Sequence, residues 1–146
     1  MNDNRENLVK VFIDLPNYWL WKDESMWAPA LGNDLYELDN SPFCACGLSY
    51  KDVVLAIAES PSQKPRVLRI EWRGGHRTLR FRFPENVDRP ERDRILEKLT
   101  GMGTFLEGGG YCLSSLDVPP STDYQAVCDQ LFALENEPEV GGAEPL

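Results

Sequence analysis

RVLRIEWRGGHRTLRFRFP, residues 66–84, alternates apolar and polar side chains on both sides of a Gly-Gly dipeptide. Such alternation is typical of half-buried strands, and Gly74-Gly75 tolerates the positive φ of a tight turn. The stretch therefore predicts a β-hairpin centred on the two glycines. The side of this hairpin that faces the core would consist of Leu68, Ile70, Leu79 and Phe81.

The opposite side of the expected hairpin is cationic. Arg69 would lie opposite Arg80 and Arg73 opposite His76, and like charges directly opposite each other destabilise a hairpin. We therefore expect this side to meet an anion, helped by the backbone N–H groups of the turn. The alternative is neutralisation by the acidic C-terminal third of the chain. The candidate ligand-binding residues are Arg69, Arg73, His76, Arg77 and Arg80.

Charge is unevenly distributed along the 146 residues, whose formal net charge is −9. Residues 1–63 carry 4 basic and 10 acidic side chains, residues 64–98 carry 11 and 6, and residues 99–146 carry none and 8. An acidic chain lacks the positive footprint that phosphate contacts require, so we expect no nucleic-acid partner. Its field would instead attract a basic protein partner.

Before the hairpin, the chain predicts short strands broken by turns. Residues 8–15 alternate like a strand, and LYEL, FCAC and DVVLAIAE follow, with a turn at residues 32–34. Closely spaced short strands indicate a small curved sheet or partial barrel. The tryptophans at positions 19, 21 and 27 stand among charges; we expect core or rim packing, with a recognition anchor as the alternative.

After Pro84 the pattern predicts two helices separated by a second hairpin. Asp88 and Glu91 form a D-x-x-E cap for the first helix, and Gly101 or Gly103 ends it. The hairpin is TFLEGGGYCLSSLDV, and Ser121 or Thr122 caps the second helix. The core face of this second helix would consist of Tyr124, Val127, Cys128, Leu131 and Leu134.

These elements predict an α+β fold, in which antiparallel hairpins carry two helices on one face after a small curved sheet or partial barrel. We expect a flexible N-terminus over residues 1–7 and a single domain over residues 8–135. Within it, residues 8–63 form a strand-rich half and residues 64–135 a ββαββα half. The Glu-, Pro- and Gly-rich residues 136–146 predict an acidic mobile tail.

No catalytic motif is evident, so we name no catalytic residue. His76 is the only histidine, and a lone histidine in a glycine turn is more often solvated than a general base. Cys44 and Cys46 would point to opposite faces of a strand, and the chain lacks C-x₂-C spacing, so we expect free thiols, no metal and no cofactor. Without a signal peptide or a membrane-length apolar run, we expect a cytoplasmic protein with no membrane partner.

Several segments resemble the bacterial domain-of-unknown-function family 4265. The similarity lies in Trp27-Ala28, LYELDNSPF (35–43), Asp52-Val53-Val54, RGGHRTLRF (73–81) and the Leu99-Gly103-Glu107 spacing, and it extends over roughly residues 8–135. The chain departs at Gly74, where the family tends to have serine. The resemblance implies a bacterial origin and a compact α+β domain, and it brings no activity or catalytic residue.

Two functions follow as hypotheses. The first is a non-catalytic binding protein, immunity- or antitoxin-like, that masks a basic protein partner with the acidic residues Asp34, Glu37 and Asp39. The second is an enzyme or ligand-binding domain that recognises an anionic small molecule on the arginine-rich hairpin. The sequence leaves the oligomeric state open.

Overall fold

The computed structural model describes residues 8–16, 21–108, 113–135 and 143–145. The chain divides into two compact units, Met1–Gly75 and His76–Leu146. The sequence places the boundary between two halves of one domain at residues 63 and 64. The structure divides the chain later, because the strand that follows residue 65 belongs to the first unit.

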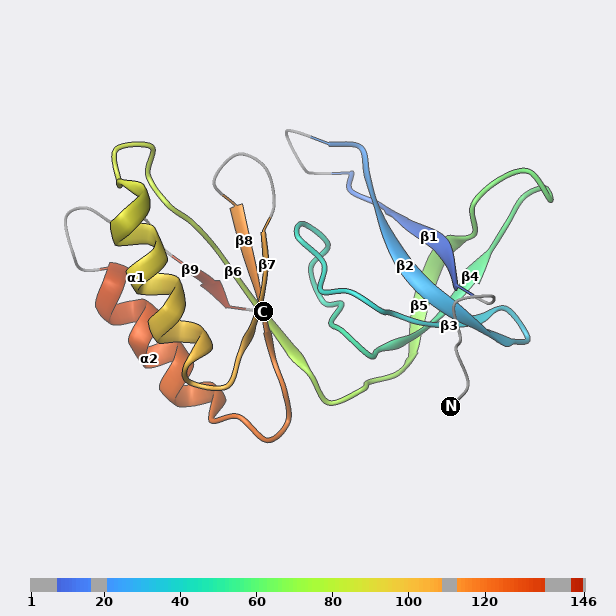
Figure 1. The fold of residues 1–146 in the computed structure, drawn as a ribbon. Helices are drawn as coiled ribbons and strands as arrows, with labels where there is room; N and C mark the ends of the chain where they lie inside the picture. Colours follow the sequence, from blue (N-terminus) through green and yellow to red (C-terminus); the bar gives the residue numbers. More distant parts are fainter. Residues whose placement is uncertain (1–7, 17–20, 109–112, 136–142, 146) are drawn as a thin grey trace. The chain divides into compact units, whose positions relative to one another are not determined.

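The first unit is a closed five-stranded barrel (Figure 1). Its strands are β1 (Leu8–Asp14), β2 (Asp23–Gly32), β3 (Leu35–Glu37), β4 (Val53–Ile57) and β5 (Arg66–Trp72). Consecutive strands pair antiparallel, and the turn between β2 and β3 has positive φ at Gly32, Asn33 and Asp34, as the sequence predicts for residues 32–34. Buried Val11, Met26, Ala28, Val54 and Val67 fill its interior.

The barrel closes where β1 meets β5. Five strands that alternate in direction bring the first and last strands together in parallel, and here they share the single pair Phe12 and Arg66. The backbone N–H of Phe12 donates to the carbonyl of Pro65 at 3.0 Å. This seam is therefore the shortest strand pairing in the barrel.

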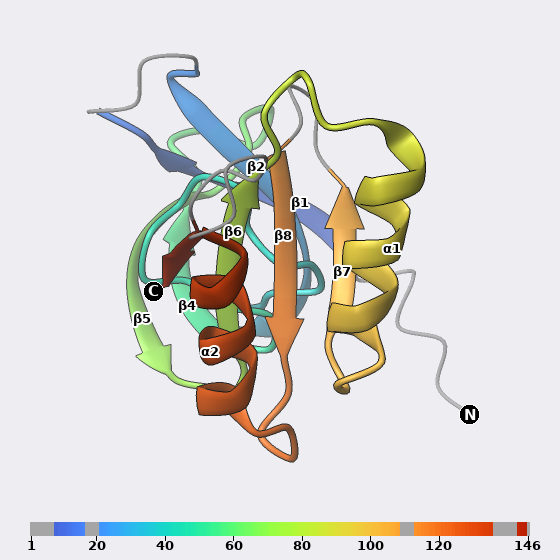
Figure 2. The ribbon, with the colours of Figure 1, turned by 90° about the vertical axis from the view of Figure 1, so that its left-hand side faces the viewer.

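The second unit is a four-stranded sheet with two helices. Its elements are β6 (Arg77–Arg82), α1 (Arg89–Thr100), β7 (Phe105–Gly108), β8 (Leu113–Val118), α2 (Tyr124–Glu135) and β9 (Ala143–Pro145). The strand order is β7-β8-β6-β9, and all neighbours are antiparallel. Figure 2 shows both helices in front of the sheet.

One hydrophobic cluster joins the helices to the sheet. Leu79 and Phe81 of β6 pack with Ile95 and Leu99 of α1 and with residues of α2 and β8. The α2 members are Val127, Cys128 and Leu131, as the sequence predicts. The expected mixture of helix and strand is thus confirmed, with strands predominating, and the expected partial barrel is a closed one.

The caps follow local chemistry. Asp88 precedes α1 and its Oδ1 accepts the N–H of Glu91 at 2.9 Å, while Gly101 donates its N–H to the Glu97 carbonyl at 2.9 Å. Both agree with the sequence prediction. At α2 the prediction of Ser121 or Thr122 is wrong, because the carboxylate of Asp123 accepts the N–H of Ala126 at 3.1 Å.

The predicted hairpin over residues 66–84 is wrong. β5 pairs with β4 and β1, whereas β6 pairs with β8 and β9, so the two strands belong to different units. Leu79 and Phe81 are buried as expected, but Leu68 is 49% exposed and Arg80 only 4% exposed. Alternation identifies a strand without identifying its partner, and here each strand has partners elsewhere in its own unit.

Two smaller expectations also differ. FCAC (43–46) is irregular backbone, because the carboxylate of Glu24 binds its N–H groups in place of a neighbouring strand. Within the segment expected to be a mobile tail, Ala143–Pro145 forms β9 beside β6. The N-terminal residues 1–7 and the remaining tail residues lie outside the described part of the chain.

Candidate functional site

The five predicted ligand-binding residues do not form one face of a hairpin. Arg69 and Arg73 belong to the barrel unit, and His76, Arg77 and Arg80 belong to the sheet unit. The expected Arg69–Arg80 and Arg73–His76 pairings do not exist, since β5 and β6 pair with other strands. Each cation must therefore be considered within its own unit.

The two barrel arginines have acidic partners. Arg69 Nε lies 2.5 Å from Glu71 Oε1, in an ion pair whose arginine is 67% exposed. Such exposed pairs contribute at most about 1 kcal/mol to stability. Arg73 Nη1 donates to the Gly47 carbonyl and lies 3.4 Å from Asp52 Oδ2. The positive charge that the sequence predicts for an anionic ligand is thus partly neutralised inside the barrel unit.

Asp52 organises the end of β5. Its side chain is fully buried and accepts the N–H groups of Ser49 and Gly74, each at 2.9 Å. A Cβ on Gly74 would lie 2.4 Å from the Lys51 carbonyl oxygen. Glycine therefore permits the close backbone approach at this position.

His76 is paired with a carboxylate rather than solvated. Its Nδ1 lies 2.8 and 3.1 Å from the two carboxylate oxygens of Asp117. Burial raises the pKa of Asp117 above its ordinary value, and the contact with His76 opposes that rise. The pair fixes the orientation of the imidazole, as carboxylates commonly do for histidine.

The remaining two cations are also engaged. The Arg77 guanidinium lies over the Tyr124 ring, 4.3 Å from its centroid. Burial, followed by the interaction with Cys128, raises the pKa of Tyr124, and the Arg77 charge opposes this. Arg80 is buried in the middle of β6. His76 and Arg77 thus have partners within their own unit, and Arg80 is buried.

The acidic candidates Asp34, Glu37 and Asp39 flank β3. Asp34 and Asp39 are exposed, whereas Glu37 pairs with Lys51 at 3.1 Å. Trp27 of β2 lies beside Asp39, because its carbonyl accepts the Asp39 N–H at 2.8 Å. We call the group of Trp27, Asp34, Glu37 and Asp39 the β3 surface.

Trp27 is exposed on this surface, although the sequence favours core or rim packing for it. Met26 and Ala28 point into the barrel, so Trp27 points outward and is 46% exposed. The Lys10 ammonium lies over its ring, 4.8 Å from the centroid. Trp21 is also exposed, and Trp19 lies outside the described residues. Alternation with buried neighbours is the sequence signal that could have identified Trp27 as an exposed anchor.

Glu24 holds the loop that follows the β3 surface. Its carboxylate accepts three successive backbone N–H groups, from Phe43 at 2.6 Å, Cys44 at 3.0 Å and Ala45 at 2.8 Å. The Oδ1 atom of Asn40 also accepts the backbone N–H of Trp27, at 2.8 Å. Residues from β2 therefore fix the loop position, and no local motif in the sequence indicates this.

Three cysteines fall in the described part of the chain. Cys44 and Cys128 are buried free thiols as expected, but Cys46 is exposed, and Cys112 lies outside the described residues. Among the residues described, no group of three or more His, Cys, Asp or Glu side chains is placed to hold a metal ion. The expectation of no metal and no cofactor stays a prediction. Within the same residues, no helix is long and apolar enough to cross a membrane.

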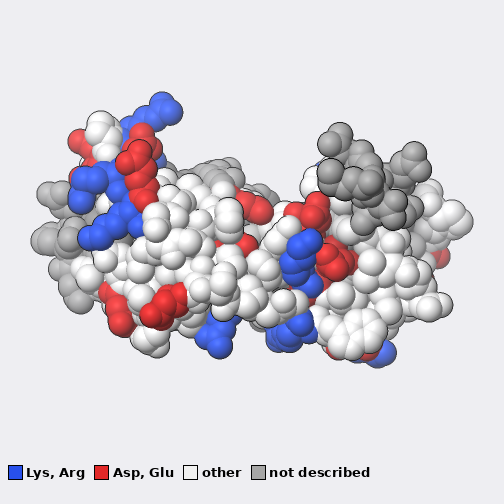
Figure 3. Space-filling view, turned by 60° about the horizontal axis from the view of Figure 1, so that its bottom comes forward, with Lys and Arg blue, Asp and Glu red and all other residues white. Residues whose placement is uncertain are grey.

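Figure 3 shows basic and acidic side chains next to each other on the face that it draws. One such pair is Arg94 with Glu91 on α1, at 2.5 Å. Several cations of residues 64–98 thus have acidic neighbours, among them Arg66, Arg69, Arg73 and Arg94.

A five-stranded barrel followed by a four-stranded sheet with two helices defines a small α+β protein with strands predominating. The chain belongs to the family described as domain of unknown function DUF4265, whose model matches residues 24–140. The resemblance seen in the sequence is confirmed. No curated protein matches the chain.

The fold recurs in a solved structure. A crystal structure of a hypothetical protein from Neisseria gonorrhoeae is similar, with a TM-score of 0.77 and 13% sequence identity. The alignment covers 94% of this chain and 93% of that one. At this identity the likeness concerns the fold alone.

Proposed function

We propose that this protein is a non-catalytic binding protein of a bacterial cytoplasm, immunity- or antitoxin-like, which masks a basic protein partner. The observation that carries the proposal is the outward-facing Trp27 beside exposed Asp39. Tryptophan is enriched among the residues that dominate binding energy at interfaces, usually within a polar rim. The β3 surface has this composition.

Lys10 indicates how a basic partner would use the ring. Its ammonium lies 4.8 Å from the Trp27 ring centroid, so the ring already accepts a cation within the chain. A lysine or arginine of the partner would take the place of Lys10 on the Trp27 ring, with Asp39 at the rim. The net charge of −9 would speed the encounter.

The alternative, an anionic small molecule on Arg69, Arg73, His76, Arg77 and Arg80, draws no support from the geometry. These residues are divided between two units, and four of them have acidic or aromatic partners within their own unit. Arg80, the fifth, is buried.

The test is capture of the partner from the native bacterium with variants of the β3 surface. The wild-type chain should retain a basic protein, and Trp27→Ala combined with Asp39→Lys should lose it. Asp93→Lys makes the same charge change at an exposed position of α1 and should retain the partner. Equal capture by all three chains, or recovery of no basic protein by the wild type, would contradict the proposal.

A further inference from the structure

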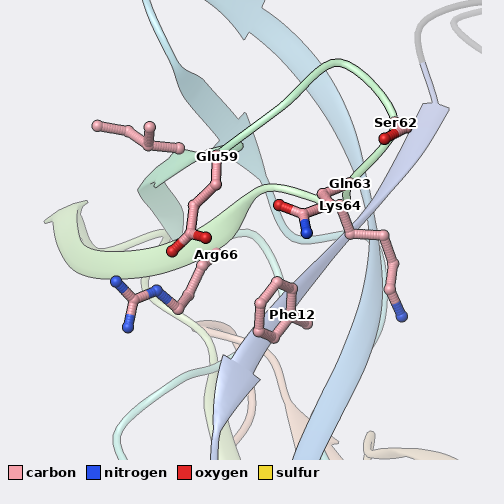
Figure 4. A pocket seen from close by; sticks show the side chains of 7 residues that line it. Phe12, Glu59, Ser62, Gln63, Lys64 and Arg66 are labelled. Carbon is pink, nitrogen blue, oxygen red and sulfur yellow. The ribbon is translucent and has the colours of Figure 1, made fainter.

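A hollow of about 390 Å³ lies beside the seam of the barrel (Figure 4). β1 and β5 pair only at Phe12 and Arg66, and the loop between β4 and β5 lines the space next to that pair. The residues that line the hollow include Phe12, Ile57, Glu59, Gln63, Lys64 and Arg66. Its volume is within the range of roughly 300–1,000 Å³ of small-molecule sites.

Two opposite charges face each other in this hollow. Figure 4 shows the carboxylate of Glu59 directed toward the guanidinium of Arg66. Glu59 forms no hydrogen bond or ion pair with any residue in the described part of the chain. Arg66 Nη1 lies 3.3 Å from Asp14 Oδ2, which leaves most of the five guanidinium N–H donors for another group.

The neighbouring groups restrict which ligand fits. Lys64 Nζ donates to Ser25 Oγ at 2.7 Å, and in Figure 4 its side chain points away from Glu59. A simple anion at Arg66 would be repelled by Glu59, and a simple cation at Glu59 would be repelled by Arg66. Phe12 and Ile57 add apolar lining to the hollow, and Gln63 contributes an amide.

We propose that the hollow binds a free α-amino acid, with its ammonium group at Glu59 and its carboxylate at Arg66. A zwitterion satisfies both charges at once, and a carboxylate and a guanidinium form the stronger, charge-assisted class of hydrogen bond. The side chain of the amino acid would lie along Phe12 and Ile57. This site lies apart in sequence from the β3 surface, and the proposal does not depend on that surface having a partner.

The first test is a thermal-shift screen of the wild-type chain with each proteinogenic amino acid, followed by NMR titration of those that raise the Tm. Backbone amide signals of residues 59–66 and of Phe12 should shift. The N-acetylated and the amidated forms of the same amino acid lack one charge each, and each should bind about tenfold more weakly or worse. If no amino acid binds, or if both modified forms bind as well as the parent, the proposal is wrong.

Variants separate this hollow from other surfaces. Glu59→Gln and Arg66→Gln remove one charge each from exposed positions, and each should lower affinity about tenfold or more. Arg69→Gln makes the same change on the same strand outside the hollow and should bind like the wild type. Undiminished binding by Glu59→Gln, or loss confined to Arg69→Gln, would place the ligand elsewhere and overturn the assignment. Circular dichroism spectra that match the wild type confirm that each variant is folded.

Discussion

The fully buried carboxylate of Asp52 accepts the backbone N–H of Gly74 at 2.9 Å, across 22 residues of sequence. The same carboxylate binds Ser49 and lies near Arg73, so it fixes the loop after β3 and the end of β5 in one arrangement. Gly74 is therefore attached to the barrel loop rather than placed in a tight hairpin turn.

Gly74→Ala should destabilise the barrel. The added Cβ would lie 2.4 Å from the Lys51 carbonyl oxygen, a backbone atom that moves only with its loop. Forcing extra atoms into a packed region typically costs about 1–3 kcal/mol in the free energy of unfolding. Urea denaturation with an unchanged m-value would measure the loss.

Gly32→Asn is the matched control. Its added Cβ would meet nothing within 4 Å, so the change opposes folding only through the positive φ of 91°, which asparagine tolerates better than other side chains. We therefore expect a loss of stability smaller than that of Gly74→Ala. Equal midpoints for Gly74→Ala and Gly32→Asn would contradict the close approach at Gly74.

Glu24→Gln should loosen the loop that contains Phe43, Cys44 and Ala45. Glutamine replaces one acceptor oxygen with an N–H₂ group, which cannot accept the amide bonds that the carboxylate now takes. Leaving a partly buried donor unsatisfied costs about 1–3 kcal/mol. Hydrogen exchange should accelerate at these three amides, whereas Glu71→Gln in an exposed ion pair should leave them unchanged. Unchanged exchange in Glu24→Gln would argue against the carboxylate as the fixing group.

Asp117 should make stability depend on acid pH. Burial raises its pKa above the ordinary value of 3.8, so the folded chain binds more protons than the unfolded chain between that value and the raised one. The contribution of Asp117 to the free energy of unfolding is therefore greatest below pH 3.8 and falls as the pH rises through the raised pKa.

Asp117→Asn removes this titration, so the stability difference between wild type and variant should shrink as the pH rises through that window. Denaturation at pH values from about 3 to about 7 would measure it. Asp93→Asn, at an exposed position, should show no such trend. A difference that grows with pH would reverse the inferred sign of the shift.

Association with a basic partner should depend strongly on salt. Exposed charges are screened over about 8 Å at physiological ionic strength, so added salt should slow association more than it speeds dissociation. Charge reversal at Asp34, Glu37 and Asp39 should lower the on-rate in stopped-flow measurements, whereas reversal at Arg69 should change it little. A salt-independent on-rate would show that the acidic surface does not steer the encounter.

The sequence predicted most helices and strands correctly, but it did not predict which strands pair with each other. The D-x-x-E cap at Asp88 and Glu91 and the buried positions of α2 depend on neighbours within a few residues, so the sequence contains the necessary signal. The predicted hairpin at Gly74 is wrong, because a strand with alternating apolar and polar residues can pair with any neighbouring strand, antiparallel or parallel. The competing partner was Asp52, whose buried carboxylate has no local sequence signature.

The candidate sites show the same division. Asp34 and Asp39 were predicted as exposed acids and are exposed, since charged turn residues are seldom buried. Phe12, Glu59 and Arg66 meet only because a barrel closes, and nothing in their spacing indicates it. Sites assembled by closure of a sheet require the three-dimensional structure.

The parallel seam at Phe12 and Arg66 also has a consequence for aggregation. Every other strand pair in the barrel joins consecutive strands, whereas this one joins positions more than 50 residues apart and has a single pair. If it opened, β1 and β5 would become free edges able to pair with strands of other chains. Charged side chains on edge strands oppose such pairing, and Lys10 and Asp14 on β1 and Arg66 and Arg69 on β5 supply them. The charges beside the seam thus oppose aggregation when the barrel opens.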